Sequence, residues 1–182
     1  MKLYLVRHGQ TDWNAEGKMQ GRRGAGLNEL GVKQVEDLKV RLNDFDFSIC
    51  FSSPLKRAVE TAEILVGDRC EILYDERLVE RGFGIFEGRS FEVFWDSVGD
   101  NDIEDRRLNY SKDGLEPINS ILGRARSFLE DVKDNYEKND NILVVAHGAF
   151  LRALHFEIVG YDDDTDFHGF HFENAEMREY EI

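Results

Sequence analysis

The fold of this chain is decided by a stretch near its start, Leu3-Tyr4-Leu5-Val6-Arg7-His8-Gly9-Gln10-Thr11. The apolar first half predicts a buried β-strand, which runs directly into Arg7 and His8. At the C-terminal end of a strand in an open α/β sheet, side chains face the crevice where ligands bind, and Gly9 lets backbone or ligand come close. An Arg-His-Gly sequence alone is more often an ordinary polar strand end than a site. His8 therefore needs partners at the ends of other strands.

The composition is that of a soluble globular protein. With 182 residues, 41% hydrophobic and 33% charged, the chain is long enough to bury a core, and we expect one domain over residues 1–182. The formal net charge of -14 argues against nucleic-acid and anionic-membrane partners, because both bind through basic patches. No leader or membrane-length apolar run is visible, so we expect a cytoplasmic protein. Cys50 and Cys70 lack metal-ligand spacing, and we expect free thiols.

Strand-like and helix-like patterns alternate along the chain. The strand-like apolar runs cover residues 3–6, 47–52, 71–74 and 141–146. The run at 141–146 is continuous, which is typical of a strand buried on both faces of a parallel sheet. The tail predicts two closing strands, at 170–172 and 177–182, of which at least one can be antiparallel.

Four helices are expected between these strands. Asn28 is placed as an N-cap before the first, and Ser53-Pro54 as the N-cap and first helical residue of the second. Apolar residues at helical spacing predict two more helices, over residues 118–132 and 150–158. The alternation predicts a three-layer α/β/α sandwich around a mostly parallel, doubly wound sheet.

Periodicity breaks down at about residues 82–114, where aromatic residues alternate with carboxylates. We interpret this segment as a short insertion that lies over the C-terminal strand ends. Its aromatic residues are better explained as support for the insertion than as the lining of an apolar pocket. Arg106 and Arg107 either contact the distal part of a substrate or form an exposed pair balanced by neighbouring carboxylates.

Polar side chains follow the ends of the expected parallel strands, and these are Arg7, His8, Arg57, Glu80 and His147. Because the carboxyl ends of parallel strands lie at one edge of a sheet, we expect the five to converge. Guanidinium groups hold a phosphoryl group by paired hydrogen bonds, and a neutral imidazole can attack phosphorus. Glu80 then serves as the acid that protonates the leaving alkoxide, and afterwards as the base for an attacking water.

Several further motifs accompany these residues. They are Thr11 with Trp13 and Asn14; Gln20-Gly21; Leu27-Asn28-Glu29-Leu30-Gly31; Ser52-Ser53-Pro54-Leu55-Lys56-Arg57-Ala58; Leu78-Val79-Glu80; Glu116 with Arg124; and Ala146-His147-Gly148 with Leu151-Arg152. In these motifs the chain resembles the histidine phosphatase superfamily, the phosphoglycerate mutase-like proteins, over nearly all of its length.

The resemblance implies a role for each matched residue. His8 would be the phosphorylated histidine and Glu80 the proton donor. The phosphate pocket would consist of Arg7, Arg57 and His147, helped by Asn14 and Gln20. It implies no metal and no cofactor. As loop residues, Asn14 and Gln20 could instead satisfy local backbone groups.

The branch of the family is indicated by departures from the mutase pattern. Ala149 follows the second His-Gly, and Arg81-Gly82-Phe83 follows Glu80, where the cofactor-dependent mutases usually have other residues. These departures and the short insertion favour water as acceptor, as in the small phosphatases such as the alpha-ribazole phosphatase and broad-specificity group. We therefore expect a phosphomonoesterase acting on a small phosphate ester. A phosphoglycerate mutase-type transferase and a phospholigand-binding regulatory module remain the alternatives, and homo-oligomerisation stays open.

For the other polar residues we expect structural rather than chemical roles. Glu116 and Arg124 are expected to pair two turns apart on the long helix. His155, His168 and His171 lack companions at metal-ligand spacing and receive no role. The acidic run at 162–166 is interpreted as a solvated loop.

Overall fold

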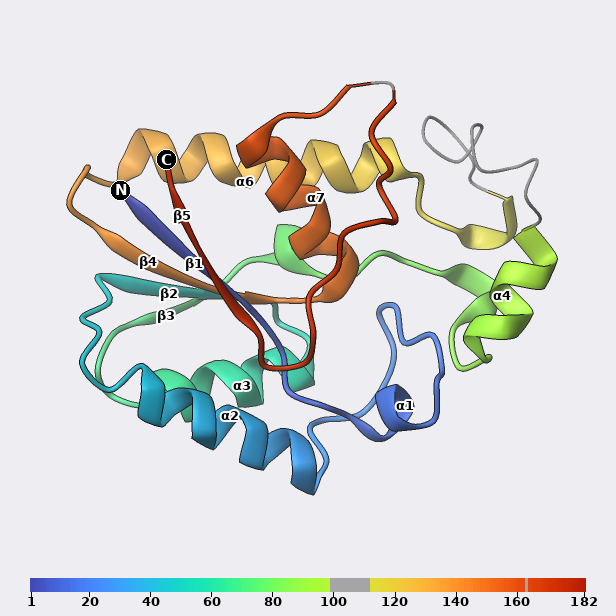
Figure 1. Ribbon diagram of the computed structural model, residues 1–182, viewed down its shortest axis with the longest axis horizontal. Helices are drawn as coiled ribbons and strands as arrows, with labels where there is room; N and C mark the ends of the chain where they lie inside the picture. Colours follow the sequence, from blue (N-terminus) through green and yellow to red (C-terminus); the bar gives the residue numbers. More distant parts are fainter. Residues whose placement is uncertain (99–111, 163) are drawn as a thin grey trace.

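The computed structural model describes residues 1–98, 112–162 and 164–182. These residues form a five-stranded sheet in the order β3-β2-β4-β1-β5 (Figure 1). Its strands are β1 (Lys2–Arg7), β2 (Ile49–Ser52), β3 (Ile72–Tyr74), β4 (Asn141–Ala146) and β5 (Met177–Glu181). The first four are parallel and β5 is antiparallel to β1, which confirms the predicted mostly parallel sheet. The register pairs Arg7 with Ala146 and Ser52 with Val145, so the strand ends that precede the expected site are level.

Helices cover both faces of the sheet (Figure 1). On one face lie α2 (Glu29–Arg41) and α3 (Lys56–Val66), and on the other α6 (Ile118–Asn135) and α7 (Gly148–Val159). Alternate residues of β4 therefore enter different cores: Val144 packs with α6 and α7, and Val145 packs with α2 and α3. This two-sided burial explains why β4 is apolar without alternation. Within the described ranges, we find no helix both long and apolar enough to cross a bilayer.

Short elements gather beyond the C-terminal ends of the parallel strands (Figure 1). They are α1 (Asp12–Ala15), η1 (Glu76–Leu78), η2 (Gly84–Phe86), α4 (Phe91–Val98) and η4 (Lys112–Gly114). A small core of Met19, Phe86, Phe94 and Leu115, with Phe83 against it, packs η2 and α4 against the segments that follow α1 and η4. Part of the insertion's aromatic content is thus internal support. Arg106 and Arg107 lie outside the described residues.

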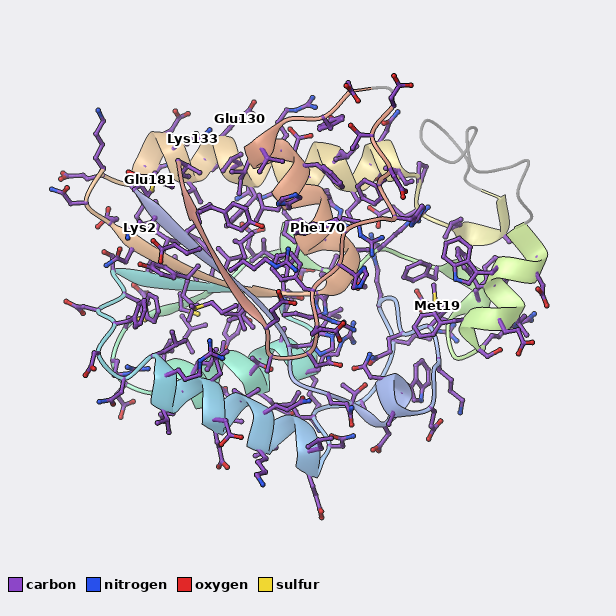
Figure 2. The ribbon with its side chains drawn as sticks, viewed as in Figure 1. Lys2, Met19, Glu130, Lys133, Phe170 and Glu181 are labelled. Carbon is purple, nitrogen blue, oxygen red and sulfur yellow. The ribbon has the colours of Figure 1, made fainter. Side chains whose placement is uncertain are left out.

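Two local predictions differ from the structure. Ser53 is not the N-cap of α3: the cap is Leu55, and Ser53 Oγ accepts the Leu55 N–H at 3.3 Å in the preceding turn. Residues 170–172 form no strand, because β5 already occupies the free edge of β1. Phe170, labelled in Figure 2, instead stacks on His155 of α7 with ring centroids 3.6 Å apart. The Asn28 cap of α2 is confirmed by its 2.8 Å bond from Gly31 N to Asn28 Oδ1.

The first turn of α2 packs directly on the loop that follows His8. A Cβ added to Gly9 would lie 2.6 Å from Gly31 O, and one added to Gly31 would lie 2.0 Å from Gln10 O. Both glycines therefore allow a close approach that a larger residue would prevent. Helix α2 and the His8 loop consequently have a fixed separation.

We expect Gly31→Ala to lower the free energy of unfolding by about 1–3 kcal/mol, although alanine favours helices, because its methyl group would displace the Gln10 backbone. Gly123→Ala is the matched control: this exposed α6 glycine has no atom within 4 Å of an added Cβ. Alanine there should stabilise the protein by about 0.5–1 kcal/mol. Urea unfolding of both variants tests this, and equal stabilisation by both would contradict the packing argument.

Candidate active site

A cavity of about 230 Å³ lies at the C-terminal ends of the parallel strands. Four of the five strand-end residues line it: Arg7, His8, Arg57 and Glu80. His147 is fully buried beside this wall, with its ring centroid 5.2 Å from that of His8. The structure therefore brings the five predicted residues together, although they come from segments far apart in the sequence.

His8 follows β1 and is 2% exposed. Arg57 Nε lies 3.2 Å from His8 Nε2, and a guanidinium group can only donate, so Nε2 is the acceptor. The ring proton is then on Nδ1, which donates to Gly9 O at 2.7 Å. Burial lowers the pKa of His8 well below its usual value, and the charges of Arg57 and Arg7 lower it further. Near neutral pH this is an uncharged imidazole with an unprotonated Nε2.

Two of the arginines that line the cavity, Arg7 and Arg57, donate to backbone carbonyls. Arg57, in the first turn of α3, donates to Arg23 O at 2.8 Å and to Gly21 O at 2.7 Å. Arg7 donates to Phe172 O at 2.6 Å, and its buried Nε has no hydrogen-bond partner. Burial lowers the pKa of Arg57 to about 10, so it remains charged near neutral pH. Among the described residues neither arginine forms an ion pair, which leaves positive charge for an anion.

His147 follows β4 directly and is the N-cap residue of α7. Its Nε2 lies 2.7 Å from Ser53 Oγ, and its buried Nδ1 has no hydrogen-bond partner. Burial lowers the pKa of His147 well below its usual value, and the nearby Arg57 charge adds to this effect. When the Ser53 hydroxyl donates to Nε2, the proton is on Nδ1, which is a buried donor available to a phosphoryl oxygen.

Glu80 lies at the N-terminus of α7. Its Oε1 accepts hydrogen bonds from the backbone N–H groups of Arg81 (2.9 Å), Ala149 (3.1 Å) and Phe150 (3.2 Å). The positive end of the helix therefore holds this carboxyl group at the cavity wall. It is the one carboxyl group among the described residues that line the cavity.

Asn14 and Gln20 also line the cavity, and their surroundings differ. Asn14 Oδ1 accepts from the Thr11 backbone N–H and hydroxyl, each at 3.1 Å, so its oxygen is used in the cap of α1. Gln20 is 7% exposed, and its Oε1 has no hydrogen-bond partner. The Gln20 oxygen is thus free and the Asn14 oxygen is occupied, but a phosphate oxygen needs a donor, so either residue would have to contact it through its amide NH2 group.

Five further residues that line the cavity have no role predicted from the sequence: Lys18, Arg81, Arg152, His168 and His171. Arg152 NH1 lies 3.3 Å from His168 Nδ1, which joins α7 to the tail. Arg152 could have been anticipated, because it lies one helical turn after Gly148 and so shares its face. His168 and His171 lie in an irregular segment, and no periodic pattern places them.

Comparisons with known proteins agree with this geometry. Residues 3–182 match the model of the Histidine phosphatase superfamily (branch 1). The "Probable 2-carboxy-D-arabinitol-1-phosphatase" of Arabidopsis thaliana is 35% identical over 163 residues, which are 87% of this chain and 33% of that protein. The "Metal-independent phosphoserine phosphatase" of the same plant is 31% identical over 168 residues, 86% of this chain and 68% of that protein.

Solved structures extend the likeness to the whole fold. YhfR of Bacillus stearothermophilus superposes with a TM-score of 0.85 at 28% identity, covering 98% of this chain and 89% of that one. Phosphoglycerate mutase-like proteins are also among the relatives. The chain is therefore similar both to phosphatases and to proteins named for mutases.

We expect the free energy of unfolding to fall as the pH drops from about 7 to about 5.5. An unfolded histidine gains a proton near pH ~6.5, whereas His8 and His147 stay neutral because their folded-state pKa values are lowered. The unfolded state then binds more protons, so stability decreases below that pH by at most about 1.4 kcal/mol per pH unit for each histidine. Urea unfolding of the wild type and His8→Asn at both pH values tests this. The variant should lose less stability, and an equal loss would contradict a neutral buried His8.

Proposed function

The chain belongs to the histidine phosphatase superfamily, and from this premise we propose that it hydrolyses small organic phosphate monoesters through a phosphohistidine intermediate on His8, without a metal. The observation that carries this proposal is the unprotonated Nε2 of His8, 3.2 Å from Arg57 Nε at the wall of a cavity. In a protein of net charge -14, such a local cluster of arginines suits an anionic substrate.

In the first step, the Arg57 Nε–H leaves His8 Nε2 and turns to a phosphoryl oxygen of the substrate. The freed Nε2 lone pair then attacks phosphorus as the ester P–O bond breaks. We expect the oxygens of a phosphoryl group on Nε2 to accept from Arg57 Nε, from the unpartnered Nε of Arg7 and, in the tautomer protonated there, from His147 Nδ1. These donors compensate the negative charge that spreads over the equatorial oxygens. A protonated Glu80 transfers its proton to the leaving alkoxide, so the alcohol departs neutral.

In the second step, water attacks the phosphohistidine. The Glu80 carboxylate takes a proton from the water, the P–N bond breaks, and inorganic phosphate is released with His8 restored. Aromatic side chains of the insertion, among them Phe83, Phe94 and Trp95, line the same cavity and would contact the leaving group. The metal-independent phosphoserine phosphatase among the relatives supports hydrolysis without a metal ion.

We expect His8→Ala to lower phosphate release from p-nitrophenyl phosphate by at least about 1,000-fold, because the nucleophile is lost. His155→Ala is the control, since His155 lies on α7 and contacts Phe170 and Tyr180 rather than the cavity. Activity should survive EDTA, and loss with rescue by a divalent cation would contradict the metal-free mechanism.

A parallel assay with 3-phosphoglycerate follows isomer formation. Isomerisation with little phosphate release would indicate a mutase, and ligand binding without either reaction a regulatory module.

Glu80→Gln should slow hydrolysis of alkyl phosphates by about 100-fold or more, because an alkoxide leaving group requires protonation. Aryl phosphates should lose less than about tenfold, since a nitrophenolate leaves without a proton. Steady-state kcat/KM on p-nitrophenyl phosphate and glycerol phosphate provides the comparison, because it reports the steps up to departure of the leaving group and not the later hydrolysis of the phosphohistidine, in which Glu80 acts as base. Equal losses on both substrates would remove Glu80 from the acid role.

A further inference from the structure

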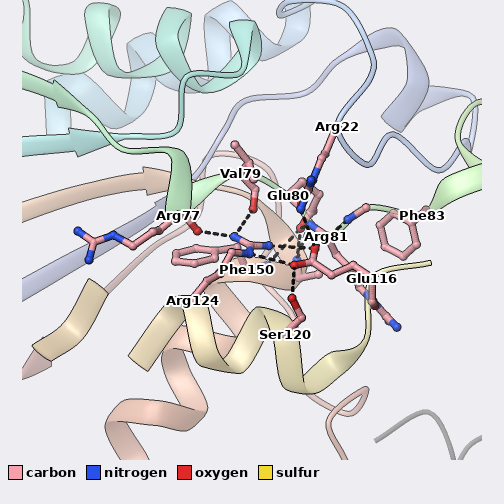
Figure 3. Close-up of polar contacts among 12 residues, drawn as sticks. Arg22, Arg77, Val79, Glu80, Arg81, Phe83, Glu116, Ser120, Arg124 and Phe150 are labelled. Atoms are coloured by element: carbon pink, nitrogen blue, oxygen red, sulfur yellow. Dashed lines mark hydrogen bonds and ion pairs between the residues drawn. The ribbon is translucent and has the colours of Figure 1, made fainter. Parts of the chain in front are cut away.

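The segment that carries Glu80 depends on side chains from elsewhere for its position (Figure 3). Residues 79–82 lie between the short helices η1 and η2 and belong to no helix or strand. Their backbone groups need partners from other parts of the chain. Those partners are supplied largely by the ion pair of Glu116 and Arg124.

Arg124, on α6, holds the chain before Glu80. Its NH1 donates to Val79 O at 3.0 Å and also to Arg77 O. Its Nε and NH2 donate to the two carboxylate oxygens of Glu116 at 2.9 and 3.0 Å. This two-bond arrangement leaves the guanidinium group a single orientation.

Glu116 holds the chain after Glu80. Its Oε2 accepts the Gly82 N–H at 3.0 Å, and its backbone N–H donates to Gly82 O at 2.8 Å. Its own carbonyl accepts Arg81 Nε at 2.7 Å. The side chain is only 9% exposed, and although burial acts against ionisation, Arg124 and the Gly82 N–H hold the pKa of Glu116 below its usual value. The ionised Glu116 and Arg124 therefore form hydrogen bonds to the backbone on both sides of Glu80, at Gly82 and Val79.

Arg22 connects the Glu116–Arg124 pair to the part of the cavity wall that holds Arg57. Its NH2 lies 3.3 Å from Glu116 Oε2, and its Nε lies 3.5 Å from Glu80 O. The residues on either side of Arg22 in the chain supply the carbonyls that hold Arg57. The Glu116 carboxylate is thus bonded to the segment that carries Glu80 and, through Arg22, to the loop at residues 21–23 that holds Arg57.

We propose that Glu116 is a positioning residue that keeps the carboxyl group of Glu80 within reach of the leaving-group oxygen. The inference rests on the proposed function and adds a residue to it. The sequence predicted the Glu116–Arg124 pair, which is confirmed, but it placed Glu116 on the long helix. Helix α6 begins at Ile118, so Glu116 lies before it, where its backbone and carboxylate can reach residues 81 and 82.

The chain offers a matched control in the ion pair of Arg126 and Glu157. Arg126 is also on α6, and its Nε and NH2 donate to the two oxygens of Glu157 at 3.0 and 3.1 Å. The Glu157 side chain is 8% exposed, close to the value for Glu116. Glu157 contacts Arg126 and Tyr161 and does not line the cavity. The Arg126 side chain is more exposed than that of Arg124, 55% against 19%. Glu157→Gln therefore measures the effect of losing a two-bond Arg–Glu ion pair of α6 that lies away from the cavity.

The test compares kcat/KM on an alkyl and an aryl phosphate for the wild type and four variants: Glu116→Gln, Glu157→Gln, Glu80→Gln and the Glu80→Gln/Glu116→Gln double variant. Glu116→Gln should lower kcat/KM on glycerol phosphate about 10- to 100-fold and on p-nitrophenyl phosphate less than about threefold, because kcat/KM reports the step in which the leaving group is protonated. In the Glu80→Gln background it should add less than about twofold, because there is no acid left to position. Glu157→Gln should leave both rates within about twofold of the wild type.

Each other outcome overturns a distinct claim. Equal losses on both substrates in Glu116→Gln, or full additivity with Glu80→Gln, would overturn the positioning role while the phosphatase assignment stands. A wild type without phosphate release, or a Glu80→Gln variant without leaving-group selectivity, would overturn the proposed function or the acid, and this inference with it. If Glu116→Gln does not fold, Arg124→Lys, which keeps the charge but loses the two-bond geometry, must show the same selectivity for alkyl phosphates.

Discussion

The hydrogen bond from Arg57 Nε to His8 Nε2 is the interaction on which the site depends. A guanidinium group cannot accept a hydrogen bond, so this contact determines which nitrogen of His8 is unprotonated. Gly9 O, as the acceptor for Nδ1, completes the assignment. Burial and the two arginine charges then keep the ring neutral. The tautomer of His8 thus follows from a contact between α3 and the residue that follows β1, and its neutral charge follows from burial and the nearby arginines.

This arrangement is favourable for chemistry and unfavourable for stability. Arg7 has a buried Nε, and His147 a buried Nδ1, without a hydrogen-bond partner. Buried polar groups without partners cost about 1–3 kcal/mol each. The fold tolerates them because the sheet and its two cores are closely packed around the strand ends, as shown by fully buried residues such as Phe128, Phe150 and Leu65. A phosphoryl group that accepts from both donors would recover this loss in the bound state.

The convergence of the strand-end residues was predictable, and several details were not. Arg7, His8 and His147 follow strands that are paired in register, so their proximity is a property of any parallel sheet. The predicted N-cap role of Ser53 is wrong, because its hydroxyl forms hydrogen bonds with Leu55 N and with His147 instead. His147 lies 94 positions away in the sequence, so no local pattern indicates this contact. Residues 170–172 have strand composition, but β5 had already taken the edge of β1. The local sequence pattern of residues 170–172 cannot show that the edge of β1 is already paired with another strand.

The sequence by itself determined the layered α/β class, the strands that end at the site, the five chemical groups there and the membership of the family, because periodicity, strand ends and motifs are local features of the chain. The tertiary structure alone decided the tautomer of His8, the placement of Glu80 on the N-terminus of α7, and the contribution of Arg152 and His168 to the cavity. It also decided that Glu116 reaches the segment that carries Glu80. These features arise from hydrogen bonds and charges between segments far apart in the sequence. Their geometry exists only once packing has set the distances between those segments.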